Sequence, residues 1–172
     1  MKNNLYTIKG AIIWLTGRPA AGKTTLCMNI KNELEQKNMK VYQIDGEVIR
    51  KGLNSDLGFS KEDRIENVRR IAEVACMFCK LGYYVIVCTV SPFEEMRTLC
   101  RNICRQFPYM EIYIKAELPT CIKRDYKNVY NKENLLVDYY EKNKDAELII
   151  DTERLSVDQC KIKILESITK IL

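Results

Sequence analysis

The segment Gly17–Thr24, with the sequence GRPAAGKT, constrains the fold most, because it fits the phosphate-binding-loop pattern G-x-x-x-x-G-K-[ST] at every specified position. Residues 11–16 before it form an apolar run rich in β-formers. After it, Leu26, Ile30 and Leu34 recur at helical spacing. We therefore expect a buried strand, a phosphate loop and an amphipathic helix in succession, a context that a chance glycine-rich turn would lack.

This loop predicts a nucleotide site with ATP as its ligand. Main-chain N–H groups and the positive end of the following helix would bind phosphate oxygens. Lys23 would reach the β- and γ-phosphates, and the Thr24 hydroxyl would hold the Mg²⁺ that accompanies ATP. Thr25 could reach the α-phosphate or only cap the turn. The predicted site comprises Gly17, Arg18, Ala20, Ala21, Gly22, Lys23, Thr24 and Thr25.

The remaining pattern predicts an α/β fold with a parallel sheet and helices on both faces, because strands alternate with helices along the chain. Further strands are expected over residues 40–44, 83–90, 110–115 and 147–151, and helices over 22–36, 60–80, 93–106 and 156–172. A length of 172 residues, 47% of them apolar, fits one domain over 1–172. Residues 119–130 and 132–142 are polar and predict a helical lid at about 116–145.

Two helices have clear apolar faces. The helix over 60–80 is expected to bury Ile65, Val68, Ala72, Ala75 and Cys79, with Arg64, Asn67 and Arg70 on its opposite side. The final helix is expected to bury Val157, Cys160, Ile164, Ile168 and Ile171.

Charge and cysteine content limit the class of protein. A formal net charge of +5 with dispersed basic residues fits a small anionic substrate better than nucleic acid. Neither a signal peptide nor a membrane span is apparent, so we expect a cytoplasmic protein without a membrane partner. The eight cysteines include two helical pairs, Cys76 with Cys79 and Cys100 with Cys104, that could form a Cys₄ zinc site. Their apolar-periodic positions favour packing as small hydrophobic side chains instead.

Several ordered motifs closely resemble adenylylsulfate (APS) kinase. They are WLTG at 14–17, the phosphate loop, DGEVIR at 45–50, GLN at 52–54, DLGF at 56–59, DRIENVRR at 63–70 and SPF at 91–93. The likeness covers roughly two thirds of the chain and resumes weakly at Arg124-Asp125 and Asp151-Thr152. It implies a P-loop NTP hydrolase-like kinase fold, with ATP and Mg²⁺ used to phosphorylate the 3′-hydroxyl of a nucleotide whose 5′-phosphate carries sulfate.

The resemblance also implies roles for single residues. Asp45, at the carboxyl end of a strand where parallel sheets bind ligands, would be the base for the attacking hydroxyl, or else only a turn former. Ser91 would lie near the transferred phosphate, although it could also cap the next helix. Arg124 is assigned to the ATP site. The acceptor residues would be Glu47, Arg50, Phe59, Arg64, Asn67, Val90 and Ser91.

The lid departs from the family pattern. APS kinases carry a Phe-Thr-Gly element whose phenylalanine covers the acceptor adenine, but no phenylalanine follows Phe107 here. Residues 124–130 read RDYKNVY, and Glu94 stands where the family often has a basic residue. These departures favour a relative of APS kinase that phosphorylates cytidine diphosphoramidate in capsule modification. Many relatives are dimers, so a homodimer is possible.

Two alternatives remain open at this stage. In an ordinary APS kinase, one of four tyrosines, Tyr126, Tyr130, Tyr139 or Tyr140, would replace the missing phenylalanine. A nucleotide-binding module without turnover belongs to a different class. Such a module would be expected to lack Lys23, Thr24 or Asp45, and all three are present.

Overall fold

The computed structural model describes residues 10–131 and 139–170. Within these residues, five strands form one sheet in the order β2-β3-β1-β4-β5, with every neighbouring pair parallel. The strands are β1 (Ala11–Thr16), β2 (Val41–Asp45), β3 (Tyr84–Cys88), β4 (Tyr109–Lys115) and β5 (Leu148–Asp151). The predicted α/β fold with a parallel sheet is confirmed.

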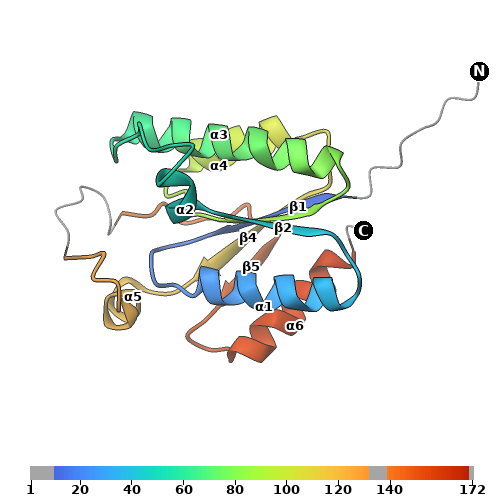
Figure 1. The fold of residues 1–172 in the computed structure, drawn as a ribbon. Coiled ribbons are helices and arrows are strands. Elements are labelled where there is room, and N and C mark those ends of the chain that lie inside the picture. The colour runs from blue at the N-terminus through green and yellow to red at the C-terminus, as the bar shows by residue number, and fades with distance from the viewer. Residues whose placement is uncertain (1–9, 132–138, 171–172) are drawn as a thin grey trace, which may run out of the picture.

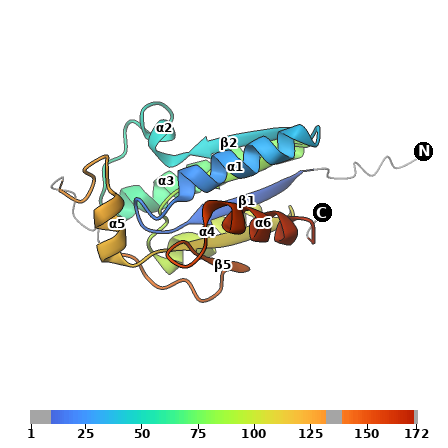
Figure 2. The same cartoon turned by 90° about the horizontal axis from the view of Figure 1, so that it is seen from below.

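Helices cover both faces of the sheet, with α3 and α4 on one face and α1 and α6 on the other (Figure 1). The two short helices, α2 and α5, lie at the same end of the sheet but apart from each other (Figure 2). The helices are α1 (Lys23–Gln36), α2 (Gly46–Arg50), α3 (Lys61–Lys80), α4 (Glu94–Cys104), α5 (Leu118–Arg124) and α6 (Val157–Ile168).

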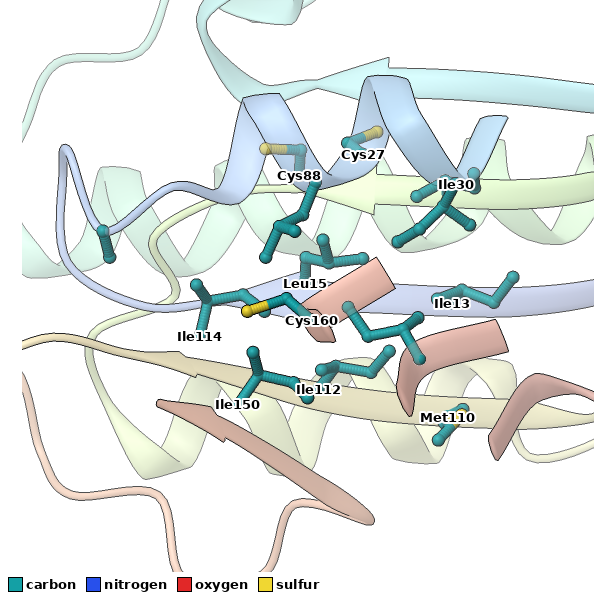
Figure 3. Close-up of a cluster of buried hydrophobic side chains, with 14 of the residues drawn as sticks. Ile13, Leu15, Cys27, Ile30, Cys88, Met110, Ile112, Ile114, Ile150 and Cys160 are labelled. Atoms are coloured by element: carbon teal, nitrogen blue, oxygen red, sulfur yellow. The ribbon is translucent and has the colours of Figure 1, made fainter. Parts of the chain in front are cut away.

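The central strand β1 is buried along its whole length because it packs on both helical layers. Ile13 and Leu15 belong to the cluster under α1 and α6, shown in Figure 3. Ile12 and Trp14 alternate with them and belong to the cluster under α3 and α4. The phosphate loop leaves this strand directly, so it is anchored to the most buried element of the sheet.

Two sequence expectations about helix faces are wrong. Val157 is exposed, because it is the first residue of α6 and lies before the apolar face begins. Asn67 is buried rather than on the outer side of α3, because its amide pairs with Asn54. Residues 46–50, which lie outside the predicted strands and helices, form the short helix α2, which the Asp45 side chain caps by accepting the Glu47 N–H at 2.8 Å. Ile171 lies outside the described residues.

The predicted lid contains less helix than expected. Its helix α5 ends at Arg124, where Asp125 begins a turn by accepting the N–H of Tyr130 at 2.8 Å. The second predicted helix, at 132–142, is absent from its described part, 139–142, and residues 132–138 lie outside the description. Tyr140 is buried there, because its hydroxyl bonds Thr16 at 2.8 Å and its ring stacks on Tyr113.

The eight cysteines are all buried, which confirms that they pack as apolar side chains. Across the described ranges, no three or more side chains of cysteine, aspartate or glutamate gather where they could hold a metal ion. The alternative of a Cys₄ zinc site therefore has no support. None of the helices in the described ranges is both long and apolar enough to cross a bilayer.

Candidate active site

The backbone of the phosphate loop adopts conformations that favour glycine. Gly17 has φ 146° and Gly22 has φ 104°, both in the left-handed region. A Cβ on Gly17 would lie 2.3 Å from the carbonyl oxygen of Ile114, so this position admits no side chain. Ala20 also has a positive φ, of 57°. The loop therefore follows a strained path around a small space, as a phosphate cradle requires.

The start of α1 is suited to an anion. No side chain among the described residues caps this helix, and its first turn carries no carboxylate. Its first N–H groups and its dipole can therefore serve phosphate oxygens. The donor set of this helix end, the Lys23 ammonium and the Thr24 hydroxyl fits a nucleotide triphosphate with its Mg²⁺.

Lys23 lies folded back on the loop that precedes it. Its Nζ donates to the carbonyl oxygens of Gly17 at 2.8 Å and Arg18 at 2.6 Å. Burial lowers the pKa of Lys23, while nearby groups that include Asp45 and Glu47 oppose that shift. Within the described residues this buried ammonium bonds two carbonyls, and it would gain strongly from the negative charge of a bound phosphate.

A cleft of about 380 Å³ opens at the carboxyl ends of the strands, between the phosphate loop, α2, α3 and the segment after α5. Its wall contains every predicted site residue except Gly17, Arg18 and Ala21. Gly17 and Ala21 are buried residues of the loop itself, and the Arg18 guanidinium lies over the ring of Tyr140. Asp45 and Lys23 share the cleft, as the predicted transfer chemistry requires.

The carboxylates after β2 have separate surroundings. Asp45 caps the helix α2 through Oδ1, a role that differs from the predicted turn former and uses one of its two carboxylate oxygens. Glu47 forms an ion pair with Lys127, with 2.7 Å between Oε2 and Nζ. Because Lys127 follows α5, this pair joins the two sides of the cleft mouth across 80 residues of sequence.

The part of the cleft that holds the predicted acceptor residues is organised around Phe59, which is 44% exposed. The guanidinium carbons of Arg50 and Arg64 lie 4.5 and 5.4 Å from its ring centre. Arg50 also donates to the carbonyl of Gly58 at 2.7 Å, and Arg64 donates to that of Phe59 at 2.9 Å. Burial lowers the pKa of both guanidiniums, and the charge of Arg50 lowers that of Arg64 further. Two like charges held beside an exposed aromatic ring suit an anionic nucleotide.

Asn67 is oriented by a residue that sequence reasoning missed. The Asn54 amide donates to Asn67 Oδ1 at 2.9 Å and to the Asn67 carbonyl at 3.3 Å. Since Oδ1 of Asn67 is the acceptor of that bond, its NH₂ group is the end that can donate to a ligand. Asn54 is fully buried, and its own Oδ1 lacks a partner within the described residues. Its place in the GLN motif was the only sequence signal.

Ser91 lies in the turn after β3 with φ 42°, an uncommon conformation for serine. Its Oγ accepts the indole N–H of Trp14 at 3.2 Å. The predicted capping role is not seen, because the N-cap of α4 is Phe93 and the N–H of Glu94, the first residue of α4, donates to the Glu141 carboxylate instead. Ser91 is therefore held at the cleft wall by the strand beneath it.

The segment after β4 is tied to the phosphate loop through Thr152, another residue that was not predicted. Arg124 donates to the Thr152 hydroxyl and carbonyl, both at 3.0 Å. The Thr152 hydroxyl donates in turn to the carbonyl of Ala21 at 3.0 Å. Tyr130 also reaches the loop, by donating to the carbonyl of Pro19 at 3.0 Å. Only the weak match at 151–152 pointed to this region.

Comparison with known proteins agrees with this geometry. The family model described as adenylylsulphate kinase matches residues 9–151 of this chain. The chain belongs to this family. Within the adenylylsulphate kinase family, an adenylyl-sulfate kinase of Bacillus licheniformis is 40% identical over 166 residues, which cover 92% of this chain and 84% of the relative. A probable adenylyl-sulfate kinase of Bacillus subtilis is 38% identical over 172 residues, covering 95% and 87%.

Solved structures of the adenylylsulphate kinase family share the fold. The APS kinase CysC of Mycobacterium tuberculosis, in complex with AMPPNP and APS, superposes with a TM-score of 0.87 at 30% sequence identity. The match covers 93% of this chain and 98% of that one. The P-loop kinase fold predicted from the motifs is confirmed.

Proposed function

We propose that this protein transfers the γ-phosphoryl group of ATP to the 3′-hydroxyl of adenylylsulfate. The observation that carries the proposal is the single cleft in which the phosphate loop faces Asp45 and the acceptor residues around Phe59. A phosphoryl transfer needs a positioned donor, a positioned alcohol and charge stabilisation between them. All three are available within this cleft.

Each group has a specific task in this proposal. Asp45 accepts the proton of the attacking hydroxyl, and we assign this to Oδ2 because Oδ1 caps α2. Lys23 leaves its carbonyl partners and stabilises charge on the transferred group. Thr24 would hold Mg²⁺, which would stabilise negative charge on the phosphates. Ser91 lies beside the transferred group, and Arg124 belongs to the ATP side.

The choice of adenylylsulfate rests on the family and on one tyrosine. On the sequence alone, the departures in the lid favour cytidine diphosphoramidate as the acceptor, with adenylylsulfate as the alternative. The relatives support adenylylsulfate, and none of the comparisons supports cytidine diphosphoramidate. Tyr126 lines the same cleft as Phe59 and is 88% exposed, so its ring is available to a ligand bound there. Tyr130, Tyr139 and Tyr140 are engaged by protein contacts instead. We infer that Tyr126 takes the place of the missing lid phenylalanine.

The experiment measures turnover of the purified protein with ATP and Mg²⁺, using adenylylsulfate or cytidine diphosphoramidate as the acceptor. We expect a higher kcat/KM with adenylylsulfate, and loss of turnover when a chelator removes Mg²⁺. Lys23→Ala serves as the inactive control. A preference for cytidine diphosphoramidate would overturn the acceptor, and turnover of neither nucleotide would overturn the function.

A further inference from the structure

The turn that carries Ser91 is held by buried polar contacts on three sides. The hydroxyl of Thr16 donates to the carbonyl of Val90 at 2.7 Å, and the indole of Trp14 donates to Ser91 Oγ at 3.2 Å. Arg97 Nη1 donates to the carbonyl of Ser91 at 3.1 Å. A positive φ of 42° persists at a serine only where surrounding contacts determine it.

Arg97 belongs to a buried charge network that reaches across the sheet. It is 4% exposed, and its Nε lies 3.6 Å from Oε1 of Glu111 on β4, which is 2% exposed. The Asn143 amide donates to the same carboxylate. Arg101 lies 3.4 Å from the other oxygen of Glu111, but it reaches outward to Glu147 and its side chain is 38% exposed. Glu111 is therefore connected to the cleft wall by Arg97, which contacts both the Glu111 carboxylate and the Ser91 carbonyl.

A buried ion pair is weak evidence for stability, because removing two charges from water offsets much of their attraction. Burial raises the pKa of Glu111, and the Asn143 amide and the two guanidiniums oppose that rise. The pair does have one geometric consequence, which is to aim a guanidinium N–H at the carbonyl of Ser91. An apolar pair of similar volume could fill this space but could not hold that carbonyl.

We propose that Arg97 and Glu111 are positioning residues, which keep Ser91 in its left-handed conformation at the cleft wall. The inference rests on the proposed function, in which Ser91 lies beside the transferred phosphoryl group. The turn contacts the phosphate loop through the N–H of Gly17, which donates to the Val90 carbonyl at 3.3 Å, and among the described residues neither Arg97 nor Glu111 bonds Lys23. We therefore expect the pair to act on the turn after β3 and not on the Lys23 contacts that ATP would replace. Its effect should fall on kcat.

The activity test compares Arg97→Gln and Glu111→Gln with the wild type. We expect kcat to fall on the order of tenfold, with an unchanged KM for ATP, because a small displacement of a positioned group slows transfer without weakening ground-state binding. Arg101→Gln is the matched control. It removes a guanidinium from the same carboxylate but none from Ser91, so it should keep near wild-type kcat.

A second readout is independent of activity. Trp14 is the only tryptophan, and its indole N–H donates to Ser91 Oγ, so the single indole ¹H–¹⁵N resonance reports the position of Ser91. Ser91→Ala removes the acceptor, so its spectrum gives the indole chemical shift in the absence of this hydrogen bond. Arg97→Gln and Glu111→Gln should move the indole signal toward that position, and Arg101→Gln should leave it in place.

The double variant Arg97→Gln/Glu111→Gln separates positioning from stability. It leaves no unpaired buried charge, so its thermal midpoint should recover relative to either single variant while its kcat stays low. It also supplies the comparison if a single variant fails to fold. Wild-type kcat or a wild-type indole resonance in the folded variants would overturn the inference. If the wild type phosphorylates neither nucleotide, the proposed function fails, and the indole resonance still decides whether the pair positions Ser91.

Discussion

The donor and acceptor sides of the cleft are built in different ways. On the donor side, backbone conformation forms the phosphate cradle, and Lys23 bonds to carbonyls five and six residues before it. On the acceptor side, long side chains meet across the chain, as in the pair of Glu47 with Lys127, 80 residues apart. Lys23 is 8% exposed, whereas Phe59 is 44% exposed.

The difference shows which side can change its ligand. A loop whose φ values need glycine, packed on the most buried strand, admits few substitutions and binds any nucleotide triphosphate by its phosphates. Exposed side chains that pair with one another can be exchanged one at a time. We therefore expect ATP binding to tolerate change poorly and acceptor choice to depend on a few rings and guanidiniums.

Loss of the donor-side cation should have the largest effect. Lys23→Ala should lower kcat by ~10²–10⁴, because it removes positioned positive charge from the transferred group. Steady-state kinetics with ATP and adenylylsulfate measure the effect. Lys31→Ala, on the same helix but in a surface pair with Glu35, is the control and should leave kcat unchanged. A higher KM for ATP with an unchanged kcat would mean that Lys23 only binds the donor.

Asp45→Asn separates two roles of the residue that lies between the donor and acceptor sides, the proposed base and the cap of α2. Asparagine caps a helix as well as aspartate does, so α2 should keep its stability. It cannot act as a base, so kcat should fall by ~10²-fold. Thermal melting and kinetics on the same sample separate the two roles. Near-normal turnover of Asp45→Asn would leave the residue as a helix cap only.

On the acceptor side, Phe59→Ala should raise the KM for the acceptor nucleotide by ~10-fold, because a stacked base contributes on the order of 1–3 kcal/mol. The KM for ATP should not change. Tyr42→Ala is the matched control, since Tyr42 is an exposed aromatic residue that stacks on Phe78 away from the cleft wall. Equal changes in both KM values would contradict the separation of the two sides.

The smallest effect should come from loss of the Glu66 carboxylate, which holds Arg70 beside the segment that contains Asp56 and Phe59. Glu66 pairs with Arg69 and Arg70, and Arg70 also binds Asp56 at 2.8 Å. The side-chain hydrogen bonds from Arg69 and Arg70 lower the pKa of Glu66 from 4.5 to about 2. Because the pKa of Glu66 is lower in the folded state, its ionised carboxylate stabilises the fold at pH values above its ordinary pKa. This stabilisation is lost as the pH falls toward the lower pKa of the folded state.

The measurement compares thermal midpoints of the wild type and Glu66→Gln as a function of pH. The wild type should have the higher midpoint above pH 4.5, and the difference should disappear as the pH approaches 2. Glu73→Gln, which removes a longer 3.8 Å pair with Arg69, should show a weaker dependence. A difference that stays constant with pH would mean that the Glu66 charge does not stabilise the fold.

Much of the cleft could be predicted, because motifs mark its edges. Asp45, Ser91 and the phosphate loop each follow a strand, and parallel strands bring such positions to one edge of a sheet. Positions that depend on a distant partner were missed. Asn54 bonds a residue 13 positions away, and Thr152 bonds residues 28 and 131 positions away. Arg97 pairs with a buried carboxylate, and no local pattern displays any of these partners.

The sequence by itself determined the phosphate loop, the alternation of strands and helices, and the residues of the donor site, because these follow from local backbone chemistry and from hydrophobic period. Only the tertiary structure decided the strand order, the inward turn of Asn67, the cap on α2 and the buried pair of Arg97 with Glu111. These depend on which distant groups meet after burial. A buried polar group must find its partner in space, and its neighbours along the chain do not specify that partner.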